Sequence, residues 1–70
     1  MDIRTRIEIE GLERRATVRE RQADEHEDAA PLNHGFGTAR YMSAFDTAEK
    51  YRAEARELRE KAARLRARSA

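Results

Sequence analysis

Small and apolar residues recur at every third or fourth position from residue 41 to residue 65. The seam that they form consists of Tyr41, Ala44, Ala48, Tyr51, Ala55, Leu58, Ala62 and Leu65. Steps that alternate between three and four residues bring these side chains to one side of a helix, as in a coiled coil. Such a helix needs a second surface to cover its seam, because the apolar side would otherwise face water.

A second seam with the same spacing lies earlier in the chain. It consists of Ile9, Leu12, Ala16, Arg19, Ala23, His26 and Ala30. Pro31 disfavours helical geometry in the residue before it, so the pattern predicts a first helix over residues 12–29. Residues 31–37 contain the only proline and two of the three glycines, which predicts a loop. The longer seam predicts a second helix over residues 39–68.

Residues 1–10 form an N-terminal extension with two interpretations. Their β-branched residues alternate with charged ones, which is typical of a strand. Alternatively they extend the first helix, with Ile3 and Ile7 one turn apart and Gly11 marking a change of structure. A strand would have no partner within a helical chain, so the sequence favours the helix.

The start of the second helix also has two interpretations. Thr38 can cap a helix that begins at Ala39. Asp46 and Glu49 have the spacing of a capping box, which would start the long helix at residue 47 and leave a separate short helix before it.

Alanine recurs at every seventh residue on both predicted helices, which matches them in one antiparallel register. The facing pairs are Ala16–Ala62, Ala23–Ala55 and Ala30–Ala48. Charged residues beside the seam give the same register, with the pairs Glu13–Arg66, Glu20–Arg59 and Glu27–Arg52. Small side chains allow the backbones to approach closely, and opposite charges fix orientation and register. The predicted fold is all-α: a single domain, residues 1–70, that forms an antiparallel two-helix hairpin with an alanine-rich coiled-coil seam.

The flank on the other side of the seam is not complementary. It places Arg15 and Gln22 near Lys61 and Arg68. Arg19 occupies a seam position near Leu58, where a buried unpaired charge would be costly unless its stem extends to solvent. A chain of 70 residues builds only a small core. We therefore expect a second copy or a partner to cover this flank, and the hairpin to self-associate as a homodimer into a helical bundle.

Composition excludes several classes of protein. Basic and acidic residues nearly balance, at 15 and 14, so no overall field draws the chain to nucleic acid or membrane. The absence of cysteine excludes disulfides and thiolate metal sites. No apolar run is long enough to span a membrane and no signal-peptide pattern opens the chain, which predicts a cytoplasmic protein. A bias toward Arg and Ala indicates a bacterial or phage origin.

The aromatic residues all lie in the second half of the chain, and most are close to the predicted loop. Together with Met42, they form either a small satellite core at the tip or a patch for a partner, since aromatic residues and Met are typical interface anchors. The predicted partner-binding residues are Phe36, Tyr41, Met42, Phe45, Arg15 and Arg19.

The sequence offers little sign of catalytic or metal chemistry. His26 lies in the acidic run 24–28, but His34 falls beyond Pro31, so the two imidazoles lack the spacing of ligands on one helix. The glycines of residues 34–37 predict a turn with positive φ rather than an anion-binding loop. A two-helix hairpin has little room for an enclosed site, so no enzyme activity, metal or cofactor is expected.

These observations predict a small non-enzymatic interaction protein: a regulator, adaptor or inhibitor that binds the surface of a partner protein, encoded by a bacterium, a phage or a mobile element. The alternative is a helical dimer that binds DNA or RNA through Arg56, Lys61, Arg64 and Arg68, although glutamates interrupt this cluster. With 41% charged residues, a segment that folds only on binding its partner is a further alternative.

Overall fold

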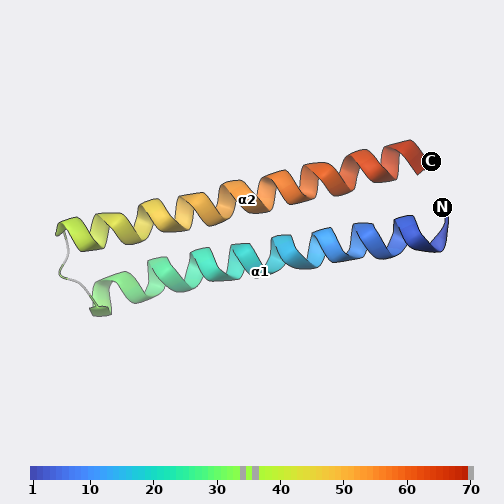
Figure 1. The fold of residues 1–70 in the computed structure, drawn as a ribbon. Coiled ribbons are helices and arrows are strands. Elements are labelled where there is room, and N and C mark those ends of the chain that lie inside the picture. The colour runs from blue at the N-terminus through green and yellow to red at the C-terminus, as the bar shows by residue number, and fades with distance from the viewer. Residues whose placement is uncertain (34, 36, 70) are drawn as a thin grey trace.

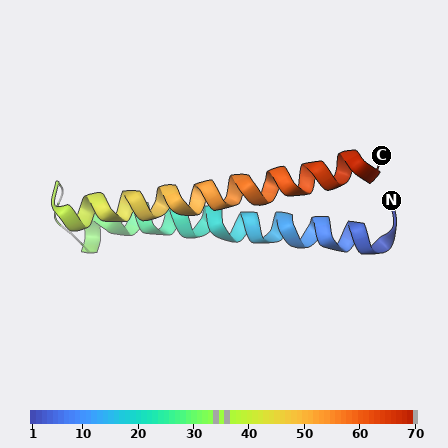
Figure 2. The same ribbon diagram turned by 45° about the horizontal axis from the view of Figure 1, so that its top comes forward.

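Two helices of equal length lie antiparallel, side by side, and make up nearly the whole chain (Figures 1 and 2). The computed structural model describes residues 1–33, 35 and 37–69. Helix α1 covers Ile3–Asn33 and helix α2 covers Ala39–Ser69, and the described residues contain no strand. The Cα trace extends over 50 × 14 × 11 Å, with both chain termini at the end opposite the connection (Figure 1). The predicted all-α antiparallel hairpin is confirmed.

Alanine forms most of the contact between α1 and α2. The buried residues are Ile9, Leu12, Ala16, Ala23, Ala30, Ala48, Ala55 and Ala62, so all six alanines of the predicted facing pairs are buried. Near the termini, Ile9 and Leu12 pack with Ala62, and the partly buried Leu58 and Leu65 lie against them. No polar side chain among the described residues is buried. The seam is therefore an almost continuous strip of small apolar contacts.

Helix α1 begins at Ile3, well before the predicted start at residue 12. Asp2 caps it: the N–H of Thr5 donates to Asp2 Oδ1 at 2.8 Å, and this bond lowers the pKa of Asp2. The strand interpretation of residues 1–10 is thus wrong from Ile3 onward. The alternation arose because Ile9 enters the seam with 2% exposure, whereas Ile3 is 72% exposed.

Helix α1 also ends later than predicted, at Asn33 instead of residues 28–30. Pro31 lies in its last turn. The bias that proline imposes on the preceding residue shifts a preference and does not forbid helical geometry. A helix that ends two residues after the proline loses few backbone hydrogen bonds through the missing N–H.

Helix α2 begins at Ala39, which settles the choice between the two predicted starts. Thr38 is the cap: its hydroxyl accepts a hydrogen bond from the N–H of Tyr41 at 3.2 Å and donates one to the carbonyl of Gly35 at 2.8 Å. Gly37, just before the cap, has a φ of 77°, as predicted for this turn. From Ala39 the helix runs without a break to Ser69, so no separate short helix precedes residue 47.

We expect Ala55→Leu to lower the free energy of unfolding by about 1–3 kcal/mol, because the larger side chain would force apart helices that meet at this buried alanine. Leu is nearly as good a helix former as Ala, so the loss reports packing. Urea denaturation measures it. The exposed Ala63→Leu is the matched control and should change stability by less than about 0.5 kcal/mol. Unchanged or increased stability of Ala55→Leu would show that the helices do not meet closely there.

We expect Gly11→Ala to raise the free energy of unfolding by about 0.5–1 kcal/mol. Gly11 lies inside α1, and a Cβ built there meets no atom within 4 Å, so alanine adds helix propensity without a clash. Gly37→Ala is the opposite case, since its positive φ should cost an L-residue about 1–2 kcal/mol. Urea denaturation of both variants at low protein concentration tests the pair. Destabilisation by Gly11→Ala would contradict the expectation.

Candidate functional site

One flank of the helix pair is closed by three ion pairs between α1 and α2. They are Glu13–Arg66, Glu20–Arg59 and Glu27–Arg52, the three pairs that the sequence predicts. Arg59 Nη2 lies 2.5 Å from Glu20 Oε1. Arg52 binds both carboxylate oxygens of Glu27 and also reaches Asp24 at 3.1 Å. The predicted register is therefore present in both the alanine strip and the charged edge.

These ion pairs shift the pKa values of their members. The hydrogen bond from Arg59 lowers the pKa of Glu20 below its ordinary value of 4.5, and that from Arg52 does the same for Glu27. The bonds from Arg52 to Glu27 and Asp24 raise the pKa of Arg52. Because the charges on this flank satisfy one another, it offers little to a ligand.

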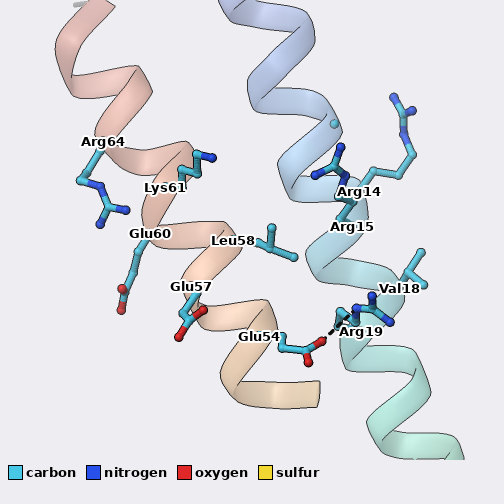
Figure 3. Close-up of a pocket in the computed structure, with 11 residues that line it drawn as sticks. Arg14, Arg15, Val18, Arg19, Glu54, Glu57, Leu58, Glu60, Lys61 and Arg64 are labelled. Atoms are coloured by element: carbon cyan, nitrogen blue, oxygen red, sulfur yellow. Dashed lines mark ion pairs between the residues drawn. The ribbon is translucent and has the colours of Figure 1, made fainter. Parts of the chain in front are cut away.

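The opposite flank carries an open groove of about 890 Å³, which we call the lateral groove. It lies between the first half of α1 and the second half of α2 (Figure 3). Its apolar lining comes from Gly11, Val18 and Leu58, and Leu58 points from α2 toward α1. Val18 is 46% exposed. The hairpin thus leaves apolar surface uncovered on this side.

Charged side chains surround the apolar lining of the lateral groove. The cations are Arg14, Arg15 and Arg19 from α1 with Lys61 and Arg64 from α2, and the carboxylates are Glu54, Glu57 and Glu60 from α2. The sequence assigns two of these arginines to a protein partner and the cations of α2 to the alternative of nucleic-acid binding. The fold brings both sets to one surface.

Arg19 is the only one of the groove cations that forms an ion pair within the described residues. Its Nε lies 3.1 Å from Glu54 Oε2, its Nη1 donates to Gln22 at 2.9 Å, and its guanidinium carbon lies 5.7 Å from the centre of the Tyr51 ring. The expected buried, unpaired charge near Leu58 is therefore not found: Arg19 is half exposed and has three partners. The pairing with Glu54, one turn before Leu58, was not predicted.

The remaining charges of the lateral groove have no ion-pair partner in the part of the chain that the structure describes. They are Arg14, Arg15, Glu57, Glu60, Lys61 and Arg64. Glu57 and Lys61 are one turn apart on α2, yet they do not bind each other. Unlike the closed flank, this side offers charges of both signs to a second molecule.

The residues predicted at the tip lie at the far end of α2 from the lateral groove (Figure 1). Tyr41 and Phe45 are partly buried and contact each other edge to face, with ring centres 4.9 Å apart. Met42 is 55% exposed. Phe36 lies outside the described residues. The predicted partner-binding set is thus divided between the tip and the groove, which receives Arg15 and Arg19.

The alternative nucleic-acid set is divided as well. Lys61 and Arg64 line the lateral groove, while Arg56 and Arg68 are not among its described lining residues. His26 faces Tyr51, as the seam predicts, with ring centres 5.5 Å apart. In the described chain no three His, Asp or Glu side chains lie together as metal ligands, and His34 lies outside that part. Neither helix has an apolar stretch that could cross a membrane.

Family models, curated proteins and solved structures give no match to this chain. Its function therefore has to be argued from the geometry and charge of the hairpin.

We expect the hairpin to lose stability as the pH falls below about 4.5, the ordinary pKa of a glutamate. A carboxyl whose pKa is lower in the folded chain than in the unfolded chain stabilises the fold while ionised, and this contribution is lost as the pH falls through the folded-state pKa. Glu20 and Glu27 are such groups. Circular dichroism melting curves at pH values from about 7 to about 3 should show a falling Tm.

The double variant Glu20→Gln, Glu27→Gln should show a smaller fall, since its amides do not titrate. Glu49→Gln is the control, because Glu49 is exposed and forms no ion pair within the described residues. Equal pH slopes for all three proteins would contradict this account of the closed flank.

Proposed function

We propose that this protein is a small non-enzymatic protein–protein interaction module, a regulator, adaptor or inhibitor that acts by occupying the surface of a partner protein. The proposal keeps the cytoplasmic location and the bacterial or phage origin that the sequence favours. The exposed apolar side chains at the tip, Met42 with the neighbouring Tyr41 and Phe45, are the proposed partner contacts, together with Phe36.

The observation that carries the proposal is the placement of large and small apolar side chains. Six of the eight buried residues are alanine. The exposed large apolar residues are Met1, Ile3, Ile7, Val18 and Met42, each at least 46% exposed. A single exposed apolar residue is ordinary, but a chain that buries its small side chains and leaves its large ones in water has apolar area available for another protein.

The shape of the hairpin supports binding over catalysis. The lateral groove is open to solvent, and its charges are side chains on the outer surface of two helices. Catalysis needs groups held in a water-excluding pocket, where electrostatic effects are strong. Rigid helices that present side chains at fixed spacing suit recognition of a protein surface.

Nucleic-acid binding has one observation in its favour, the gathering of five cations around the lateral groove. Three glutamates of α2 line the same groove, and they would repel phosphates. We therefore place this function second. Binding to DNA or RNA fragments with a steep salt dependence would reverse the order.

Affinity capture from cells of the source organism tests the proposal. A specific protein should be recovered with the wild-type chain, and its recovery should fall at least about tenfold with Met42→Glu, which places a charge in the proposed contact. Ala63→Glu is the matched control: it adds the same charge at an exposed position on the same side of α2, three heptads away. Equal recovery with both variants, or no specific protein at all, would contradict the proposal.

A further inference from the structure

We propose that the lateral groove is a self-association surface, in which α2 of one copy packs antiparallel against α2 of a second copy. The inference does not rest on the partner proposed at the tip, because that contact lies at the other end of α2 (Figure 1). It rests on the order of charges along α2 and on the apolar surface beside them.

Four charged residues of the groove form a self-complementary row. Glu54, Glu57, Lys61 and Arg64 are spaced by three, four and three residues, so they lie on one side of α2. Positions 54 and 64 are equally distant from residue 59, and so are positions 57 and 61. Two antiparallel helices centred there bring Glu54 of each copy to Arg64 of the other, and Glu57 of each to Lys61 of the other. The contact contains four opposite-charge pairs.

These charges are available for such a contact. Glu57, Lys61 and Arg64 have no ion-pair partner within the described chain. Glu54 binds Arg19 through one carboxylate oxygen, Oε2, and its other oxygen can accept a bond from a second cation. On the closed flank, by contrast, the cations of α2 already bind α1.

The same charges select one register and one direction. A shift of one heptad in one direction sets Glu54 against Glu57 and Lys50 against Lys61 of the other copy, and a shift in the other direction sets Lys61 against Arg64. Parallel copies in register would set every charge against its own kind. Like charges in contact disfavour these arrangements, so the antiparallel one centred on residue 59 remains.

A second copy in this register also covers apolar surface. Val18 and the exposed side of Leu58 lie in the same groove, and Leu58 packs against the core formed by Ile9, Leu12 and Ala62. Covering them extends the existing core across two hairpins, as in a four-helix arrangement. One layer further out, Lys50 of one copy faces Arg68 of the other, so the complementary contact is confined to the middle of α2.

Sedimentation equilibrium of the full chain from about 1 to about 200 µM tests the inference. The wild type should change from one-chain to two-chain mass within this range. Glu57→Lys sets two lysines against each other across the contact, and Lys61→Glu sets two glutamates against each other. Each single variant should raise the dissociation constant at least about tenfold, whereas the double variant, which exchanges the two charges, should return to within about threefold of the wild type.

A mixture of the two single variants provides the sharpest comparison. In the heterodimer, one of the two contacts between positions 57 and 61 joins two lysines and two glutamates only if the copies self-pair, so mixing tests whether the facing positions carry opposite charges as the register requires. Mixing should restore two-chain mass that neither variant reaches alone. Glu49→Lys, an exposed position away from the groove, is the control and should dimerise like the wild type. Circular dichroism should give the same helix content for every variant.

A one-chain mass at every concentration overturns the inference, whether or not the monomer binds DNA fragments. A dimer that is indifferent to both single substitutions, or a mixture that stays monomeric, overturns it as well. Dimerisation without capture of a partner protein supports this inference and contradicts the proposed function, so the two proposals fail separately.

Discussion

Close contact between two rows of alanine holds α1 and α2 together and positions the other interhelical contacts. Ala16, Ala23 and Ala30 supply one row, and Ala48, Ala55 and Ala62 supply the other. Alanine gives little apolar area to bury, but it lets backbones approach and costs no side-chain entropy on folding. Once this strip is in register, the arginines of α2 fall within reach of the glutamates of α1 on one flank. The same strip fixes the position of the lateral groove on the other.

The two flanks differ because the charges beside the seam differ. On the closed flank each arginine of α2 meets a glutamate of α1, and these exposed pairs act mainly on orientation and register. On the lateral groove Arg15 of α1 has no such partner on α2, and Arg19 turns to Glu54. The hairpin is therefore internally complete along one side and leaves charge and apolar surface exposed along the other.

The sequence predicts the hairpin well because its strongest signals are periodic. The alanine and charge patterns agree on one register, and both are present in the structure. Element ends were less predictable. Asp2 caps α1 ten residues before the predicted start, and the helix continues past Pro31, because a few local hydrogen bonds outweigh weak residue preferences there. A cap at the second residue and a seam that already begins at Ile9 were the signals that could have found the true start.

The candidate site was less predictable than the fold. Arg15, Arg19, Lys61 and Arg64 were each singled out, but for different functions, and sequence spacing alone did not show that they share a groove. Val18, Glu54 and Glu57 were not singled out, because each reads as an ordinary solvent-facing residue of a charged helix. Their common spacing of three and four residues, next to the main seam, was the available signal for Glu54 and Glu57.

The loop and the chain termini lie at opposite ends of a hairpin that extends over 50 Å (Figure 1). If two copies pair through α2 in opposite directions, their loops point away from each other. Such an assembly is bivalent: it carries one binding tip at each end and can bridge two identical partners or two sites on a repeating array. Binding at one end raises the local concentration of the other tip, so modest affinity at each tip suffices for tight attachment.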